Sequence, residues 1–308
     1  MKSLFGLDPA TYQQHAVHRP EFGYPETNCW TDVIIELLHA CGREPLAGLG
    51  CTLALDHEGD QFTFFKPRQD EVELLYGVDV HELQIYRPIF QHAAEQAERG
   101  RTLLFEVDSW WLPDTAGASY RIKHGKTSII IDSLTEDRLV YFHNGGVFEL
   151  GGQDLQQLRD PEGLPGYAEV IRFDAGPALQ GEELTCAARE LLRDNLLRRP
   201  ATSPFTAFGE QLVREADVLL ALDQQERHTY CFSTTRMAGA AAALAAAHVR
   251  WLLGASGEDA ASALDQVSTT TRVLTMRLMR GKAFDASELV GALEASWAQA
   301  HERLDELL

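Results

Sequence analysis

The spacing of hydrophobic and polar residues changes character near residue 180. Before this point, stretches with an apolar residue at every third or fourth position give way to short runs rich in β-branched and aromatic residues. After it, helical spacing continues to the C-terminus, with breaks around Pro200, Pro204, Gly254 and Gly257. The pattern therefore predicts an α+β part followed by an all-α part.

The first regular element is an amphipathic helix predicted over Asp32 to Cys41, where Gly42 suits a C-terminal cap. A polar capping residue just before this stretch would let the helix begin close to Cys29. The candidate caps are Thr27, Asn28 and Thr31.

Further helices are predicted over 70–76 and 88–99, after which the period shortens to that of strands. The turn sequence that starts at Asn144 is a hairpin signal between two of these strands. We therefore expect an antiparallel sheet with helices at residues 1–178 and a helical bundle at residues 179–308. The strands are predicted over 102–107, 126–131, 139–143, 147–150 and 168–173, and the bundle helices over 182–198, 204–223, 226–254, 257–281 and 286–307.

Composition and charge narrow the class of protein. Hydrophobic residues make up 45% of the chain and charged residues 24%, as in an ordinary soluble protein. The net charge of −19 disfavours binding to nucleic acid or to an anionic membrane. The sequence shows neither an uncharged apolar run long enough to cross a membrane nor a signal-peptide pattern at its start. We expect a cytoplasmic protein with neither nucleic acid nor membrane as a partner.

Cys29 is the most informative of the five cysteines. The absence of a C-x-x-C pair disfavours a zinc ribbon or a disulfide framework, so no metal site is predicted. Cys29 follows a turn-like segment with Pro25 and opens an apolar helix. A thiol at a helix N-terminus is favoured as thiolate and lies near free backbone N–H groups that can stabilise an oxyanion. Cys29 is therefore the predicted nucleophile.

A cysteine nucleophile needs a base, and the base needs a group that orients it. His124, which stands just before a predicted strand, is the candidate base. Asn144 is the first choice for the orienting group, and Asp132 and His143 are the alternatives. The predicted substrate-binding residues around this site are Asn28, Trp30, Asp108 and Trp111.

The order of a cysteine on a helix, a histidine before a strand and an asparagine after the next strand resembles that of papain-like cysteine enzymes. Cys29 and the helix that follows it also resemble the N-terminal domain of the butirosin-pathway acyltransferase, which moves an acyl group from an acyl carrier protein to an aminoglycoside amine. In contrast to papain-like peptidases, the chain has no Gln between Gln14 and Cys29, which disfavours proteolysis.

Three motifs, at residues 26–30 (ETNCW), 58–67 (EGDQFTFFKP) and 141–144 (YFHN), extend the comparison. With them, nearly the whole chain resembles an uncharacterised bacterial family whose members occur beside genes for amino acid:carrier protein ligases and small carrier proteins. The resemblance implies an acyl or aminoacyl transferase that needs no cofactor of its own. The acyl group would pass from the phosphopantetheine thioester of an acidic carrier protein to Cys29, and then to an amine-bearing small molecule.

A basic helix face would suit an acidic carrier protein. Such a face is predicted at the start of the second part, at Arg189, Arg193, Arg198 and Arg199. Two other functions stay open. The protein could be a cysteine hydrolase, either a peptidase or a thioesterase, or a non-catalytic scaffold that binds a carrier protein.

Overall fold

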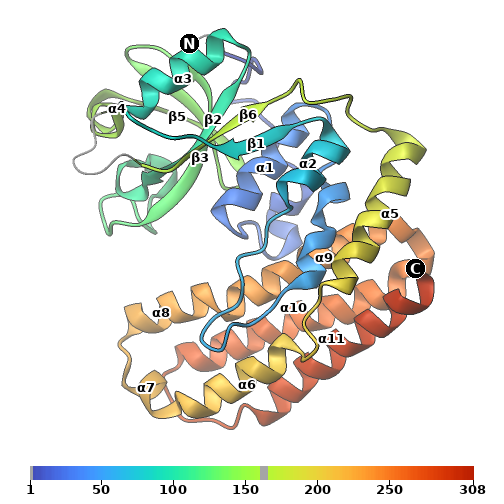
Figure 1. Ribbon diagram of the computed structural model, residues 1–308. Coiled ribbons are helices and arrows are strands. Elements are labelled where there is room, and N and C mark those ends of the chain that lie inside the picture. Colours follow the sequence, from blue (N-terminus) through green and yellow to red (C-terminus); the bar gives the residue numbers. More distant parts are fainter. Residues whose placement is uncertain (1–2, 160–165) are drawn as a thin grey trace. The chain divides into compact units, whose positions relative to one another are not determined.

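Figure 1 shows the computed structural model, which describes residues 3–159 and 166–308. The chain divides into two compact units, which we call the sheet unit and the helical unit. The sheet unit comprises Met1–Pro45 and Arg68–Leu179, and the helical unit comprises Leu46–Pro67 and Gln180–Leu308. The boundary predicted between residues 178 and 179 lies one residue from the division between Leu179 and Gln180. The hydrophobic pattern gave no sign that residues 46–67 belong to the helical unit.

The sheet unit is built on a six-stranded antiparallel sheet with strand order β1-β6-β2-β3-β4-β5 (Figure 1). All five strands predicted from the sequence are present. The additional strand, β1, is a four-residue edge strand, too short to show an alternating pattern. The strands are β1 (Asp79–Glu82), β2 (Thr102–Asp108), β3 (Lys126–Leu134), β4 (Arg138–His143), β5 (Gly146–Gly151) and β6 (Ala168–Arg172).

Helices cover both faces of this sheet. On one face, Phe105, Ile129 and Tyr141 form a core with Phe90 of α3 and Leu155 of α4. On the opposite face, α1 packs against β3 and β4. The helices are α1 (Cys29–Ala40), α2 (Gln69–Tyr76), α3 (Ile89–Glu98) and α4 (Gly152–Arg159), with short 3-10 helices at Ala16–His18, Pro20–Phe22, Ser109–Trp111 and Pro113–Thr115.

Helix α1 begins where it does because of Asn28. The Asn28 backbone is extended (φ −135°, ψ 147°), and its side-chain oxygen accepts a hydrogen bond from the backbone N–H of Thr31 at 2.8 Å. This is the geometry of a helix N-cap, and it selects Asn28 from the three candidates. Cys29 is therefore the first residue of the helix.

The helical unit contains seven α-helices in its described part. The pattern predicted single helices over 204–223 and 226–254, but each is broken in two. The second break lies at Thr234, whose φ of −115° and ψ of −90° are not helical. Without a glycine or proline at these breaks, the spacing gave no signal for them. The helices are α5 (Gly181–Leu197), α6 (Pro204–Arg214), α7 (Ala216–Ala221), α8 (Gln224–Ser233), α9 (Thr235–Leu253), α10 (Glu258–Met279) and α11 (Ser287–Leu307), with 3-10 helices at Pro45–Ala54 and Gly254–Gly257.

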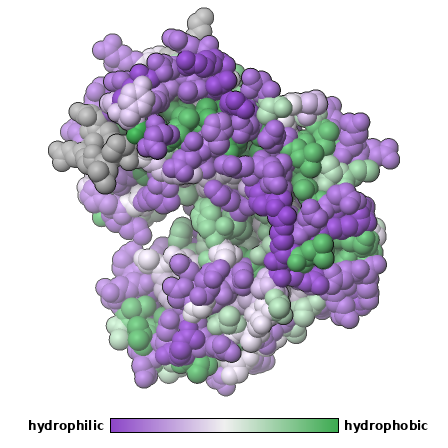
Figure 2. Space-filling view, in the orientation of Figure 1, coloured by the Kyte–Doolittle hydropathy of each residue, from purple (hydrophilic) through white to green (hydrophobic). Residues whose placement is uncertain are grey.

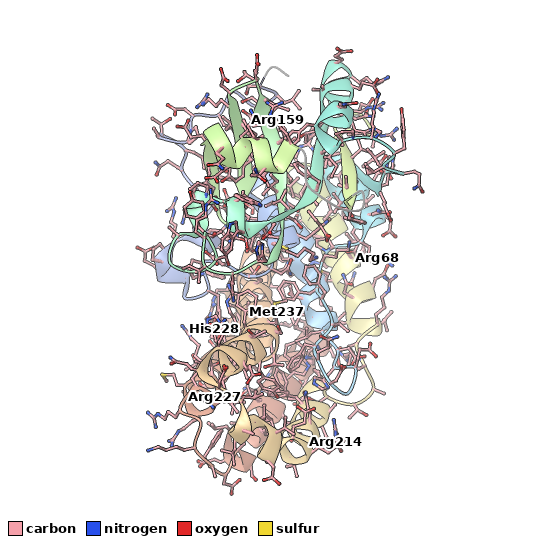
Figure 3. The ribbon with its side chains drawn as sticks, turned by 90° about the vertical axis from the view of Figure 1, so that its left-hand side faces the viewer. Arg68, Arg159, Arg214, Arg227, His228 and Met237 are labelled. Atoms are coloured by element: carbon pink, nitrogen blue, oxygen red, sulfur yellow. The ribbon has the colours of Figure 1, made fainter. Side chains whose placement is uncertain are left out.

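Hydrogen bonds to α6, α9 and α11 hold residues 46–67 in the helical unit. Burial lowers the pKa of His248 to about 4, so a neutral ring donates its one N–H to the Leu46 carbonyl at 2.7 Å. Arg214, labelled in Figure 3, donates to the carbonyl of Gly59 at 2.6 Å. Two more pairs join His57 to Gln211 at 2.9 Å and His301 to the Leu53 carbonyl at 3.0 Å.

The described surface of the helical unit carries some exposed apolar side chains. Helix α7 has none of its residues buried, and Val218 is 60% exposed. Figure 2 shows the corresponding hydrophobic patch at the lower left of the view.

Within the described residues, one helical stretch passes the length and hydropathy test for a membrane span. It lies in Gln224–Met279 and has a mean hydropathy of 1.2 over its best 18-residue window, but 72% of that window is buried. Core helices of soluble proteins pass the same test, so the stretch is a weak indication of a membrane span. The structure looks like that of a soluble protein.

Leu37 offers a test of the contact between α1 and the sheet. Leu37→Ala should lower the free energy of unfolding by about 2–5 kcal/mol, because the side chain is fully buried. Leu74→Ala on α2 is the matched control, since Leu74 is 50% exposed and its loss should cost less than about 0.5 kcal/mol. Urea denaturation followed by circular dichroism measures both. Equal losses in the two variants would contradict the packing described here.

Candidate functional site

Cys29 lies at the start of α1, against the sheet. It is half-buried, and its Sγ lies 3.5 Å from the hydroxyl oxygen of Ser128 on β3. Ser128 pairs with Glu106 of β2, so both side chains point to the face that α1 covers. The partial positive charge of the helix N-terminus favours a thiolate at this position.

Lys126 adds a full positive charge near the Cys29 thiol. It lies two residues before Ser128 on the same strand face, and its Nζ is 2.7 Å from the Glu106 carboxylate. The hydrogen bond to Glu106 raises the pKa of Lys126, and the negative charge of a Cys29 thiolate adds to the rise. The ammonium group therefore stays charged at neutral pH, within electrostatic reach of Cys29.

His124 lies at the same end of the sheet and is oriented by a carboxylate. Its Nδ1 is 2.5 Å from Oδ2 of Asp108, and its ring stacks on Trp110 with centroids 4.5 Å apart. Burial alone would raise the pKa of Asp108, but hydrogen bonds from His124 and from the backbone N–H groups of Trp110 and Gly125 hold it below the usual value. The His124 side chain is 69% exposed, so the pair is open to a ligand.

The predicted orienting residue, Asn144, is not the partner that the structure gives His124. Asn144 occupies the two-residue loop between β4 and β5 with a left-handed φ of 44°, which is the role of Asn in a tight hairpin. Asp108, predicted as a substrate-binding residue, takes the orienting position instead. Across residues 3–159 and 166–308, no hydrogen bond joins Cys29 to His124.

The two alternatives for the orienting group also have other partners. Asp132 lies at a bulge in β3 and accepts hydrogen bonds from the Ser3 hydroxyl at 2.8 Å and from the Phe5 backbone N–H at 2.9 Å. His143 pairs with Ile129 and therefore points to the sheet face opposite α1. Because side chains alternate between the two faces along a strand, His143 and Cys29 lie on opposite faces of the sheet.

Of the other predicted substrate-binding residues, Asn28 and Trp30 are buried. Asn28 caps α1, and the indole N–H of Trp30 donates to Glu169 at 2.5 Å. Trp111 is half-buried beneath the guanidinium group of Arg121, 4.4 Å from its ring. Trp110, the neighbour of Trp111, is the aromatic residue that contacts His124.

A buried cluster of one histidine and two carboxylates on α1, the helix that Cys29 opens, was not predicted from the sequence. The ring of His18 lies between two carboxylates of α1, with Nε2 3.2 Å from Asp32 and Nδ1 bonded to Glu36. Asp32 also accepts a hydrogen bond from the Thr27 backbone N–H at 2.7 Å. Two acidic residues four positions apart on a helix whose other positions are mostly apolar were the available signal.

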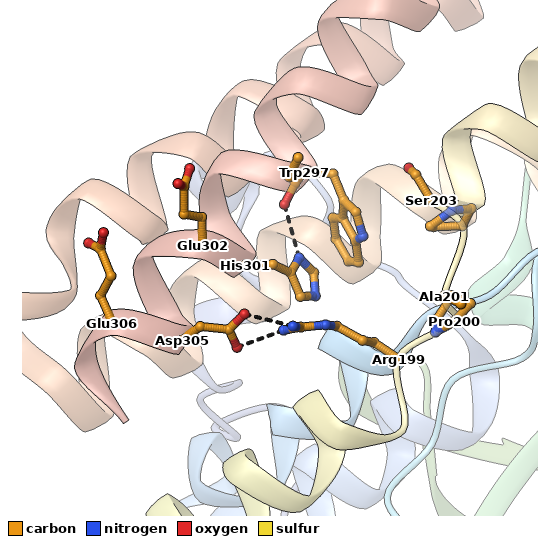
Figure 4. A pocket seen from close by; sticks show the side chains of 11 residues that line it. Arg199, Pro200, Ala201, Ser203, Trp297, His301, Glu302, Asp305 and Glu306 are labelled. Atoms are coloured by element: carbon orange, nitrogen blue, oxygen red, sulfur yellow. Dashed lines mark hydrogen bonds and ion pairs between the residues drawn. The ribbon is translucent and has the colours of Figure 1, made fainter.

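Two of the four arginines of the predicted basic face, Arg193 and Arg199, are paired within the chain. The guanidinium of Arg199 forms two hydrogen bonds with Asp305, at 2.6 and 2.7 Å. Arg193 donates to Glu190 and to the Leu308 carbonyl. The Arg199–Asp305 pair lines a cavity of about 600 Å³ between α11 and the connection from α5 to α6, next to Trp297 (Figure 4). Arg193 and Arg199 therefore already form contacts within the helical unit.

Together, the fold and the site define a class of protein. An α+β sheet unit carries a half-buried cysteine at a helix N-terminus and an exposed His–Asp pair, and an all-α unit accompanies it. Among the described residues, no group of three or more His, Cys, Asp or Glu side chains suits a metal ion.

The sequence matches the DUF1839 N-terminal domain over residues 13–173 and the DUF1839 C-terminal domain over residues 181–306, so the chain belongs to the DUF1839 family. Comparison with curated proteins gives no match.

The His18 cluster should make stability depend on pH. Burial alone would lower the pKa of His18, but Asp32 and Glu36 raise it from 6.5 to about 9. Its contribution is complete below pH 6.5, where the unfolded chain is also protonated, and is lost as pH rises through about 9. The free energy of unfolding should therefore fall by about 3 kcal/mol across this window.

Urea denaturation between pH 6 and 10 measures this slope, and His18→Gln should remove it. His81→Gln is the control, because His81 is a half-buried histidine beside Asp79 on an edge strand. In the folded wild type, the NMR signals of the His18 ring should stay those of an imidazolium up to about pH 9. Titration of that ring near pH 6.5 would refute the assignment.

Proposed function

We propose that this protein is a cysteine-dependent acyl or aminoacyl transferase with a papain-like sheet unit, acting in the cytoplasm. The acyl donor is the phosphopantetheine thioester of an acidic carrier protein, and the acceptor is an amine-bearing small molecule. The observation that carries the proposal is the position of Cys29, half-buried at the N-terminus of α1 and beside Ser128.

In the first step, the Cys29 thiolate attacks the thioester carbonyl of the donor. A new carbon–sulfur bond forms, the bond to pantetheine breaks, and the pantetheine sulfur leaves as a thiolate that takes a proton from solvent. The charge of Lys126 and the N-terminus of α1 stabilise the attacking thiolate and the oxyanion. One thioester replaces another, so the step is close to balanced in energy.

In the second step, the acceptor amine attacks the acyl–Cys29 thioester. His124 takes the amine proton, the carbon–nitrogen bond forms, and Cys29 leaves as thiolate. Asp108 accepts the Nδ1 proton of His124, which leaves Nε2 as the free acceptor on an exposed ring. The product amide is more stable than the thioester, so this step runs downhill.

The resemblance of Cys29 and the helix that follows it to the butirosin-pathway acyltransferase motivates this choice of donor. A hydrolase would use the same residues with water as the acceptor. A second candidate, a non-catalytic scaffold that binds a carrier protein, is favoured by one observation. The Cys29 thiol donates a hydrogen bond to the hydroxyl of Ser128, which is not a base.

Intact-protein mass spectrometry tests the first step. Wild-type protein mixed with an aminoacylated carrier protein should gain the mass of one acyl group, because Cys29 becomes a thioester. Cys29→Ser should gain nothing under the same conditions. Cys186→Ser is the matched control and should keep the gain, since Cys186 is an exposed cysteine of the helical unit. An unmodified wild type with every loaded carrier tried would favour the scaffold.

His124 should be needed for the second step and not for the first. His124→Gln should still form the acyl–Cys29 adduct, but transfer to an added amine should slow by about 100-fold, the usual contribution of a general base. Asp108→Asn should slow transfer less, because the base remains but loses its orienting carboxylate. His81→Gln should transfer at the wild-type rate.

Quenched-flow mass spectrometry follows the adduct and the amide separately. Transfer by His124→Gln as fast as by wild type would rule out His124 as the base. Loss of the acyl group at one rate with and without the amine would identify a hydrolase.

A further inference from the structure

On the sheet face opposite Cys29, three side chains form a buried hydrogen-bonded chain. Oδ2 of Asp114 lies 2.5 Å from Nδ1 of His143, and Nε2 of His143 lies 2.8 Å from the hydroxyl oxygen of Thr127. The other oxygen of Asp114 accepts a hydrogen bond from the hydroxyl of Tyr141. Neither the proposed mechanism nor the packing of the core requires a carboxylate and an imidazole at this position.

The chemistry of the three groups gives the chain a direction. A carboxylate accepts the Nδ1 proton of the imidazole, so Nε2 is left to accept the hydroxyl proton of Thr127. Carboxylate, imidazole and hydroxyl stand here in the order of a hydrolytic triad. However, Thr127 is only 7% exposed and His143 only 1%, so a substrate does not reach this hydroxyl. The chain has to act on its neighbours instead.

The neighbours of Thr127 are the residues that surround Cys29. Thr127 lies between Lys126 and Ser128, whose side chains point to the α1 face. At this end of the sheet, the last backbone pair between β3 and β4 is Ile129 with His143. The three residues of β3 before Ile129 therefore have no backbone partner on β4. On the side of β3 that faces β4, the hydrogen bond from Thr127 to His143 takes the place of that backbone pairing.

The other end of the chain fixes the segment that carries His124. Asp114 belongs to the connection between β2 and β3, and this connection ends at His124 and Gly125. A second anchor is Asp154 of α4, which accepts hydrogen bonds from two residues of the same connection. These are Tyr120, at 2.9 Å, and Arg121.

We propose that Asp114, His143 and Thr127 are positioning residues that hold the first residues of β3 against α1 and thereby set the reactivity of the Cys29 thiol. The proposal rests on the proposed function in so far as Cys29 is the nucleophile. The predicted site residue His143 thus acts on Cys29 through the strand, from the far face of the sheet, and not as a partner of His124.

The test compares two threonine-to-valine substitutions in the same sheet. Thr127→Val keeps the side-chain shape and removes the bond to His143. Thr102→Val is the matched control, because Thr102 is also a buried strand residue whose hydroxyl bonds to the carbonyl of Ile131. Thr127→Ser keeps the hydroxyl and is the rescue variant. The readout is the rate of Cys29 alkylation by iodoacetamide in the full-length folded protein, with Cys29→Ser identifying the contribution of Cys29.

Thr127→Val should lower the alkylation rate of Cys29 by about tenfold, since small displacements of a reacting group have effects of this order or larger. Thr102→Val and Thr127→Ser should react at the wild-type rate. Equal rates in Thr127→Val and Thr102→Val, at matched melting temperature, would overturn the proposal. If Thr127→Val does not fold, Asp114→Asn tests the same chain from its other end, with the same expected loss and the same refutation.

The alkylation assay needs no acyl donor, so the two proposals can fail separately. A wild type that takes no acyl group, together with slow alkylation in Thr127→Val, would remove the transferase and leave the positioning role. An acyl–Cys29 adduct in wild type, together with unchanged alkylation in Thr127→Val, would do the opposite.

Discussion

The contact of the His18 imidazole with the carboxylates of Asp32 and Glu36 is the interaction on which the position of Cys29 in the sheet unit depends. All three groups are buried, so removing one would leave an uncompensated charge in the interior. The contact fixes more than a helix. Asp32 holds the backbone of Thr27 just before Cys29. The His18 side chain packs so closely on Gly145 that a Cβ at residue 145 would lie 2.5 Å from the Cβ of His18 and 2.6 Å from Cγ of its ring. One ion cluster therefore sets the position of both Cys29 and the β4–β5 hairpin loop.

The alternation of side chains along β3 divides the chemistry between the two faces of the sheet. Lys126 and Ser128 face α1 and the thiol of Cys29, whereas Thr127 faces the opposite core and binds His143. A shift of one residue in the β3 register would exchange these two sets. The hydroxyl–imidazole contact on the core face is specific enough to disfavour such a shift, so polar groups on that face determine which side chains of β3 lie beside Cys29.

Local signals predicted what local physics determines. The three polar cap candidates and the apolar period after them predicted a helix that begins close to Cys29, and the turn sequence at Asn144 predicted the hairpin. The partner of His124 was different, because Asp108 is brought to it by the pairing of β2 with β3 across a connection of 17 residues. Asn144 was the predicted partner because it follows the next strand along the chain after His124, and order along the chain does not show that β2 lies beside β3. The packing of residues 46–67 with the helical unit depends on His248 and other distant partners, which no local period records.

The exposure of His124 bears on how the proposed transferase would avoid hydrolysis. If the acyl group rests on Cys29, water competes with the amine for it, and a base with 69% of its side chain exposed does not exclude water. The preference for the amine over water then has to come from the acceptor itself. An acceptor that covers Trp110 and His124 would displace water at the moment when its amine approaches Nε2. On this argument the open His–Asp pair suits an acceptor large enough to shield it, and a small amine would be transferred less efficiently than its chemistry alone allows.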